Sequence, residues 1–460
     1  MEDSAASPAH RLFHQGEQFL DAGDPEAAAQ AFQEALALQP DWPEALANLG
    51  FARELQGLAG EAEMHYRHAL TLQPDNATMH LNLGALLALQ KRHGEAEASY
   101  AAALALGADS SAVWSNLGAL NLNLKREETA EACLRQAIAL DPDNARARFN
   151  LAYLQLQRGQ WEEGWELFES RLHLPPLPPQ PDGALWQGES LQDQSLLVVC
   201  ERGHGDVIQF CRYLPWLKAQ GLRALTLLCP PALKALLQSM PEVDAVLAFD
   251  ETMPEADFDF WMPLLSAPYR AQSRPHTLPA TLPYLQPDVG LRAHWAARLP
   301  VANGLRVGLV WKGNPQFEND RDRSLPHLQT LAPLWQVPGV QFVGLQKGAG
   351  EQDTEQNSTD LTLVVLGPEL RDFADAAAVI DQLDLLISVD TATAHLAGAL
   401  GKPCWLLLPW YMTDWRWGAE GTQSAWYPGV MRLFRQPREG DWDSVVTELQ
   451  SALRALSAGH

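Results

Sequence analysis

The sequence predicts an N-terminal all-α superhelix of short repeats, followed by a pair of doubly wound α/β domains. A residue pattern that recurs every 34 positions indicates the repeats. Apolar strand-like runs that alternate with helical segments indicate the α/β part. The proline-dense stretch "LHLPPLPPQPDG" at 172–183 separates them, since it cannot continue a helix. We therefore expect a repeat array at 1–172, a stiff linker at 173–183, and α/β domains at 184–290 and 291–460.

The repeat period is carried by small and aromatic residues at fixed sites. Glycine recurs as Gly16, Gly50, Gly84 and Gly118, alanine as Ala28, Ala62, Ala96 and Ala130, and a larger apolar side chain as Phe32, Tyr66, Tyr100, Leu134 and Phe168. This spacing is that of tetratricopeptide repeats, in which small residues let paired helices approach closely. Four full repeats and a degenerate fifth are expected, stacked into a right-handed superhelix with a concave groove.

An asparagine column, Asn48, Asn82, Asn116 and Asn150, follows the same period. Asparagine is not favoured inside helices. Its amide both donates and accepts, which matches the N–H and C=O groups of an extended peptide. The column resembles the asparagine ladder of the O-linked N-acetylglucosamine transferases, which holds the backbone of the acceptor polypeptide. Duplication of a repeat with a packing asparagine is the other interpretation, and His14 takes this position in the first repeat.

Strand and helix patterns alternate through the rest of the chain. Strand-like runs occur at 195–200, 224–229 and 258–265, and the alternation restarts at 305–314 after a second proline-rich crossing. Helices are expected between the strands, and the segment 324–339 is one of them. This order is typical of two successive doubly wound domains with parallel sheets.

Ligands bind such folds at the carboxyl ends of the strands. Three turns are expected to converge there in a cleft: 201–206, 312–324 and 388–395. The candidate chemistry of this chain is concentrated in these three turns.

Composition excludes several classes of function. A net charge of −24 repels nucleic acid and anionic membranes, so neither is an expected partner. The five cysteines are scattered without a C-x-x-C pair, which favours buried thiols over disulfides or zinc. No secretory signal or bilayer-spanning stretch is readable, so we expect a cytoplasmic protein without membrane insertion.

The turn "VDTATAH" at 389–395 predicts an anion site. Thr391 and Thr393 fall in the first turn of a helix, whose N–H groups lack intrahelical partners and attract phosphate. Asp390 is either a ligand-binding carboxylate or the N-cap of that helix. His395 is either functional or an ordinary core histidine.

The stretches "SVDTATAHLAGALGKPCWLLLP", "RVGLVWKGNPQFENDRDRS", "FVGLQKG" and "DWRWG…WYP" resemble the heptosyltransferase family of GT-B glycosyltransferases, built from two Rossmann-like domains. The whole chain is similar to bacterial tetratricopeptide proteins that carry such a domain, some of which modify flagellin. The resemblance implies that Asp390, Thr391 and His395 bind the diphosphate and ribose of a nucleotide-sugar. It also implies that Lys312 supplies the cation for the leaving diphosphate, with Asn314 in the same polar loop.

The glycine turn "ERGHGD" at 201–206 resembles the acceptor-side turn of the same family. The resemblance implies that Asp206 is the general base on the acceptor hydroxyl. His204 stands beside it, and imidazole has a better-matched pKa, so Asp206, His204 and neither residue stay open as alternatives. No Walker sequence and no His/Cys cluster of metal-binding spacing is present. The paired carboxylates at 257–259, 320–322 and 441–443 are expected to be solvated turns or strand-edge residues.

The aromatic segment "MTDWRWGAEGTQSAWYPG" has two interpretations. Trp415, Trp417, Trp426 and Tyr427 either wall a sugar site or pack the core, and Arg416 between two tryptophans is the most suggestive member of the segment.

We expect a metal-independent GT-B glycosyltransferase without cofactors, which moves a sugar from a nucleotide-sugar to a protein acceptor, serine or threonine by default. The repeat groove would hold that acceptor, possibly flagellin. Two alternatives are an enzyme acting on a glycan or lipid-linked sugar with the repeats as a recruitment module, and a non-catalytic adaptor.

Overall fold

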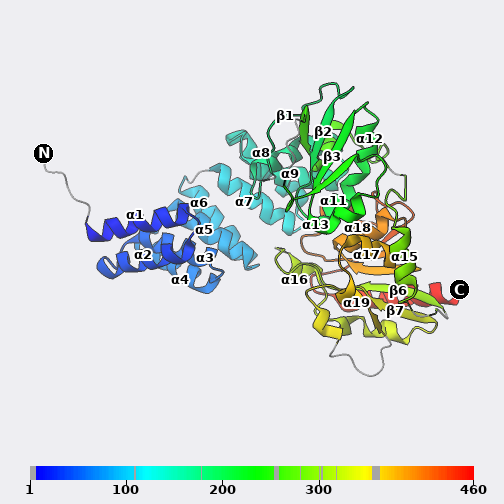
Figure 1. The fold of residues 1–460 in the computed structure, drawn as a ribbon. Coiled ribbons are helices and arrows are strands. Elements are labelled where there is room, and N and C mark those ends of the chain that lie inside the picture. The colour runs from blue at the N-terminus through cyan, green and yellow to red at the C-terminus, as the bar shows by residue number, and fades with distance from the viewer. Residues whose placement is uncertain are drawn as a thin grey trace. The chain divides into compact units, whose positions relative to one another are not determined.

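The computed structural model describes residues 7–107, 110–177, 179–252, 258–279, 281–299, 301, 304–317, 319–354 and 363–459. The chain forms two compact units, Met1–Leu151 and Ala152–His460. Figure 1 shows that the first is helical and that the second contains parallel sheets with helices, as the sequence predicts. No helix in the described ranges is long and apolar enough to cross a membrane.

The first unit consists of helix pairs. Its helices are α1 (Pro8–Asp21), α2 (Pro25–Leu38), α3 (Pro43–Leu55), α4 (Ala59–Leu72), α5 (Ala77–Leu89), α6 (His93–Ala105), α7 (Ser110–Asn123), α8 (Glu127–Leu140) and the start of α9 (Ala145–Gln157). Each odd-numbered helix from α1 to α7 packs against the next helix of its pair, and α2, α4 and α6 pack against the first helix of the following repeat.

Each repeating glycine packs against an aromatic or leucine side chain that leaves no room for a Cβ atom. A Cβ atom on Gly84 would lie 2.6 Å from the Tyr100 ring, and one on Gly118 would lie 2.5 Å from Leu134. Such distances are far below van der Waals contact, so any larger residue would push the paired helices apart. The two columns, 16 residues apart, are therefore one packing device repeated along the array.

The second unit begins within the degenerate fifth repeat. Residues 152–172, which the sequence places with the array, pack among the α/β elements through α10 (Trp161–Phe168) and the 3₁₀ segment Glu169–His173. Trp161 stacks on Trp426 with ring centres 5.1 Å apart. The buried Arg171 donates to Glu201 at 2.6 Å and to Ser266 at 2.9 Å.

The first sheet has five parallel strands in the order β1-β5-β2-β3-β4. They are β1 (Ala184–Leu185), β2 (Ser195–Val199), β3 (Ala224–Cys229), β4 (Ala245–Ala248) and β5 (Phe260–Pro263), with helices α11 (His204–Phe210), α12 (Leu214–Lys218), α13 (Pro231–Leu237) and α14 (Ala267–Arg270). The strand order reverses between β2 and β5, which is the topological switch point of this sheet.

The second sheet has six parallel strands in the order β11-β10-β9-β6-β7-β8, the doubly wound order of nucleotide-binding folds. Its strands are β6 (Leu305–Val310), β7 (Val340–Gly344), β8 (Leu363–Val365), β9 (Leu385–Val389), β10 (Cys404–Leu408) and β11 (Met431–Arg435). Its helices are α15 (Val289–Ala296), α16 (Asp320–Arg323), α17 (Phe373–Ile380), α18 (Ala392–Ala399) and α19 (Trp442–Ala458). The switch point lies between β6 and β9.

One predicted helix is wrong. The segment 324–339 forms a 3₁₀ helix, Leu328–Gln336, instead of an α-helix. Pro333 lies inside it and lacks the N–H group that an α-helix needs, and its ring would clash with the preceding turn of an α-helix. The segment still buries Leu328, Leu331 and Leu334 in the core of the second sheet.

Candidate functional site

The turns after β6 and β9 bring the predicted donor residues to the switch point of the second sheet. Lys312 and Asn314 follow β6, and Asp390, Thr391, Thr393 and His395 follow β9. Because β6 and β9 are hydrogen-bonded neighbours, their carboxyl ends lie at one edge of the sheet. Sequence positions almost 80 residues apart therefore share one end of the fold.

The N-cap of α18 is Thr391, and the alternative that Asp390 caps this helix is wrong. The Thr391 carbonyl accepts from Ala394 N–H at 3.1 Å, but its hydroxyl makes no capping bond and instead lies 3.1 Å from the Ser388 hydroxyl. The first-turn N–H groups of Ala392 and Thr393 are thus left without a side-chain cap in the described structure. This is the local arrangement that binds anions at helix N-termini.

Asp390 is held by an indole. Its Oδ2 accepts a hydrogen bond of 2.9 Å from Trp417 Nε1. Burial, together with the nearby Asp414 carboxylate, raises the pKa of Asp390 to about 6. Asp390 is therefore easier to protonate than an ordinary aspartate.

His395 is a buried neutral imidazole. Its Nδ1 lies 2.9 Å from the Tyr427 hydroxyl, and its ring stacks on Trp417 at 5.2 Å between centres. Burial and the nearby Arg416 and Arg212 guanidinium groups hold the pKa of His395 well below its usual range. The ring packs between the aromatic side chains of the C-terminal segment and the start of α18.

Lys312 has one weakly held partner. Its Nζ lies 3.8 Å from Asp353 Oδ2, an oxygen that also accepts from Trp311 Nε1 at 3.0 Å. Gln346 Oε1 accepts both the Trp311 and Lys312 backbone N–H groups at 2.9 Å, which fixes the backbone of the turn. Asn314 is exposed and its Oδ1 caps the next turn by accepting from the N–H group two residues later.

At the switch point of the first sheet, the turn after β2 leads into α11 and carries Asp206 and His204. The Asp206 Oδ2 accepts from Gly203 N–H at 2.9 Å, and its Oδ1 accepts from the Arg416 guanidinium. Burial raises the pKa of Asp206 against the opposing influence of Arg416. His204 is exposed, and the centre of its ring lies 5.2 Å from that of Phe373 in an edge-to-face contact. Desolvation lowers the pKa of His204.

The two switch points meet through α11 and α18. These helices are packed together, and a Cβ atom on Gly205 would lie 2.9 Å from His395 Cδ2 and 3.4 Å from the Ala392 Cα. Only glycine fits such an approach. The turn that leads to Asp206 is therefore brought next to the start of α18.

The sequence offered Arg416, Trp417 and Tyr427 only as candidates for a sugar wall or for core packing, and it did not predict which site residues they contact. Arg416 contacts Asp414 and Gln209, and Trp417 and Tyr427 orient Asp390 and His395. The available signal was an arginine between two tryptophans in "DWRW", because a charge in an apolar run needs a buried partner.

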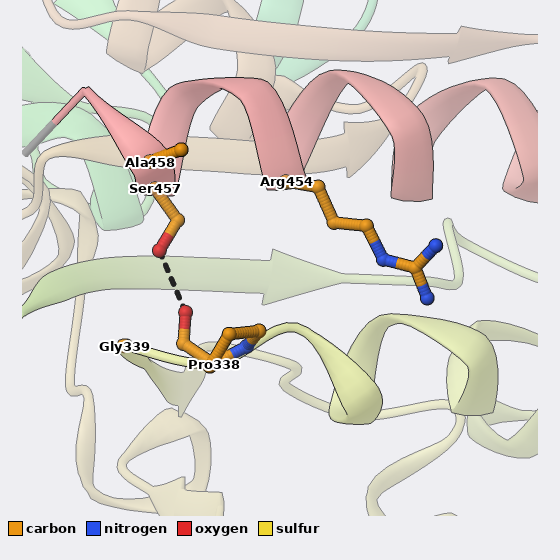
Figure 2. Close-up of a pocket in the computed structure, with 5 residues that line it drawn as sticks. All are labelled: Pro338, Gly339, Arg454, Ser457 and Ala458. Atoms are coloured by element: carbon orange, nitrogen blue, oxygen red, sulfur yellow. Dashed lines mark hydrogen bonds between the residues drawn. The ribbon is translucent and has the colours of Figure 1, made fainter.

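The tryptophans pack as core. Trp415, Trp417 and Trp426 are between 1% and 2% exposed, so the core-packing interpretation describes them better than a sugar-stacking wall. A pocket of about 220 Å³ lies beside them, between Trp161, Trp417 and Gln423. Figure 2 shows a second pocket, of about 420 Å³, where Ser457 donates to the Pro338 carbonyl; none of the predicted site residues lines it.

The paired carboxylates have structural roles where they are described, and the expectation of a solvated turn is wrong for Asp320, which is buried because Arg323 and Ser324 donate to its carboxylate. Asp259 accepts from the Ser195 N–H and hydroxyl, Asp320 accepts from Ser324, and Asp441 caps α19; Asp257 lies outside the described residues. Within the described ranges, no three His, Cys, Asp or Glu residues form a group that could hold a metal ion.

The asparagine column lies on the first helix of successive repeats, α3, α5, α7 and α9. Asn48, Asn82, Asn116 and Asn150 are each half-buried. Neighbouring helices of this set are in contact from α3 to α7, so Asn48, Asn82 and Asn116 lie on consecutive first helices that touch one another. His14 is exposed and lies 2.8 Å from Glu17, so the first repeat has no amide in the column.

Comparison with known proteins identifies both parts of the chain. Four sequence models of the tetratricopeptide repeat match residues 16–57, 56–112, 111–144 and 133–166, and the model of glycosyltransferase family 9 (heptosyltransferase) matches 329–406. The chain carries tetratricopeptide repeats and a family 9 glycosyltransferase domain. This match supports glycosyl transfer as its class of activity. The matched part of the family 9 domain contains Asp390, Thr391, Thr393 and His395, whereas Lys312, Asn314 and the turn of Asp206 precede it.

One curated relative is Protein FlbA of Caulobacter vibrioides, 30% identical over 328 residues, or 66% of this chain. The chain spans about half the length of that relative, 54%. Solved structures similar to the repeats include Pseudomonas aeruginosa PilF (25% identity, 35% of this chain, 75% of that chain, TM-score 0.33). Another is a thermophilic TPR protein of Thermus thermophilus (24% identity, 36% of this chain, 92% of that chain, TM-score 0.33).

Proposed function

We propose that the chain is a GT-B glycosyltransferase that transfers a sugar from a nucleotide-sugar to a serine or threonine of a protein. The observation that carries the proposal is the close approach of Gly205 in α11 to His395 and Ala392 in α18. It brings a carboxylate turn and an uncapped helix start together from two sheets. Group transfer between two bound substrates needs a proton acceptor and an anion site arranged in this way.

The donor half of the proposal rests on α18. Its first-turn N–H groups and positive dipole end are suited to a diphosphate, and the Thr391 and Thr393 hydroxyls add donors without adding charge. Lys312, whose Nζ is 3.8 Å from Asp353, would turn toward the leaving diphosphate. These groups would stabilise the departing charge without a metal ion. Asn314 would lie at the rim of the same site.

The acceptor half rests on Asp206, which would take the hydroxyl proton as the glycosidic bond forms. Its side chain is 23% exposed, so a substrate can reach it, and burial raises its pKa toward a value useful for proton transfer. His204, also in this turn, is the competing base. Desolvation lowers the pKa of His204, which weakens it as a proton acceptor, and its ring packs against Phe373.

The protein acceptor is proposed from the asparagine column of Asn48, Asn82, Asn116 and Asn150. The half-buried amides of this column match the donors and acceptors of an extended peptide backbone. Flagellin is the acceptor to try first, in a cytoplasmic, metal-independent reaction. A glycan or lipid-linked acceptor, with the repeats recruiting a partner, and a non-catalytic adaptor are the outcomes that the experiments below separate from it.

The donor test is thermal unfolding of the full chain with UDP, GDP, ADP, CMP and their sugar conjugates, with and without EDTA. A nucleotide at about 100 times its dissociation constant adds about 2.7 kcal/mol, a clear rise in the unfolding midpoint. We expect one nucleotide to raise it in the parent, regardless of EDTA, and not in Thr391→Ala or Lys312→Ala. Lys402→Ala, which removes a lysine paired with Asp381 at 3.7 Å, is the matched control and should keep the shift. Absence of any shift would favour the adaptor.

The acceptor test uses the nucleotide-sugar selected above with a library of unstructured serine- and threonine-containing peptides. We expect sugar-modified peptides by mass spectrometry, and loss of most of them in the variant Asn48→Ala/Asn82→Ala/Asn116→Ala. The control Gln30→Ala/Thr71→Ala changes exposed polar residues on the second helices of two repeats. Donor hydrolysis without peptide modification in the parent would favour the glycan or lipid-linked acceptor.

A further inference from the structure

Arg416 is a buried charge within the α/β unit. It lies in the 3₁₀ turn Trp415–Trp417 that follows β10, and its side chain is 6% exposed. The guanidinium carbon is 4.7 Å from the centre of the Trp415 ring and 5.5 Å from that of Phe210. A charge in such surroundings is stable only when it is paired and hydrogen-bonded.

Every guanidinium nitrogen has a protein partner. Nε donates to Gln209 Oε1, Nη1 donates to both oxygens of Asp414 at 3.1 and 3.0 Å, and Nη2 donates to Asp206 Oδ1. All three nitrogens of the guanidinium are thus engaged by protein groups. Arg416 therefore differs from Lys312, whose ammonium has its partner at 3.8 Å.

The partners come from both sheets. Asp206 and Gln209 lie on α11 after β2 of the first sheet, whereas Asp414 and Arg416 follow β10 of the second. The Asp206 carboxylate is thereby fixed at both oxygens, by Arg416 and by the Gly203 N–H group. A carboxylate has about four lone-pair sites, so two fixed contacts still leave room for a substrate hydroxyl.

We propose that Arg416 is a positioning residue for Asp206: it orients the carboxylate and keeps it ionised, while Asp414 and Gln209 hold Arg416 in place. The inference rests on the proposed function, in which Asp206 accepts the proton of the acceptor hydroxyl. It goes beyond that function because the residue that positions Asp206 comes from the second sheet, whereas Asp206 belongs to the first. The acceptor-side base is then assembled only when the segment after β10 lies against α11.

The electrostatics of the cluster agree with this role. Burial raises the pKa of Asp206, Arg416 lowers it, and Asp414 and Glu201 raise it further. Tyr153 of α9, which interacts with Asp206 and Arg416, also faces the cluster. Without the guanidinium, burial and like charges are opposed mainly by the Gly203 N–H group, so the pKa of the carboxylate must rise.

The first experiment needs no substrate. The Asp206 carboxyl is titrated by NMR in the full chain with isotopically labelled aspartate, its signal assigned with Asp206→Asn. We expect a higher midpoint in Arg416→Gln and a nearly unchanged one in Arg416→Lys, which keeps the charge. Arg212→Gln is the matched control, because Arg212 is also buried but donates to backbone carbonyls and Tyr284. An unchanged Asp206 midpoint in Arg416→Gln overturns the inference.

The second experiment measures kcat/KM against pH with the nucleotide-sugar and peptide found above. Arg416→Gln should lose about 100-fold, within the range of general-base catalysis, and its acid limb should move to higher pH. Arg416→Lys should lower kcat through poorer orientation while the acid limb stays in place. If Arg416→Gln does not fold, Arg416→Lys carries the test, since unchanged kcat in it would refute the orienting role. If Arg416→Gln shifts the Asp206 midpoint but leaves the activity unchanged, the electrostatic effect of Arg416 on Asp206 is supported and Asp206 is refuted as the base.

Discussion

The two switch points of the α/β unit are built differently. At the first sheet, Asp206 is fixed at both oxygens, by Gly203 and Arg416. At the second sheet, Thr391 leaves the first turn of α18 uncapped, and Lys312 is only loosely paired with Asp353. In the proposed function, the side that would receive the acceptor is preorganised, whereas the side that would bind the donor keeps hydrogen-bond donors that would gain partners from an anion. Substitutions at the two sides should therefore fail in different ways.

The largest effect is expected from Asp206→Asn. Loss of a general base typically costs about 10²–10⁴-fold in rate, while the nucleotide-dependent rise in the unfolding midpoint should remain. Initial rates of sugar transfer measure the first and thermal unfolding the second. His204→Ala is the control and should stay within a few-fold of the parent. If His204→Ala shows the large loss instead, the histidine is the base and Asp206 is not.

The contact between the two sides is broken by Gly205→Ala. The new Cβ would lie 2.9 Å from His395 Cδ2, so α11 and α18 must move apart, at a cost of about 1–3 kcal/mol in the free energy of unfolding. Gly94→Ala in α6 is the control, because nothing lies within 4 Å of its Cβ. That variant should be stabilised by about 0.5–1 kcal/mol, since alanine is the better helix former. Denaturant unfolding measures both, and an unperturbed Gly205→Ala would contradict the close approach.

The smallest effect is a pH dependence at Asp390. Its folded-state pKa of about 6 exceeds the ordinary 3.8, so the folded state binds more protons and loses stability as pH rises through this window. Asp390→Asn should raise the unfolding midpoint at pH 7 and leave it nearly unchanged at pH 4. Asp259→Asn should act oppositely, because hydrogen bonds from Ser195 lower the pKa of Asp259. Equal shifts of Asp390→Asn at both pH values would contradict the raised pKa.

The sequence predicts the repeat array more fully than the site. A period of 34 residues samples each packing contact several times, so pairs such as Gly84 and Tyr100 stand out as columns. The switch points were predictable too, because strand ends in parallel sheets carry ligand turns. The partner of Asp206 could not be predicted, because Arg416 lies 210 residues away and no repeat shows their contact a second time. The Pro333 segment was misjudged because helical periodicity persists in a 3₁₀ turn.

Arg171 decides where the polypeptide can be cut for expression. A fragment that starts at the proline-rich segment, residue 173, looks like a natural catalytic piece, but it would lack this arginine. Glu201, whose side chain is 3% exposed, would then be a buried carboxylate without its ion-pair partner, at a cost of about 3–5 kcal/mol. The fragment would also lack Trp161 and Trp165, which pack against Trp426 and Trp415. A shortened recombinant protein should therefore begin before Ala152 and keep the last repeat.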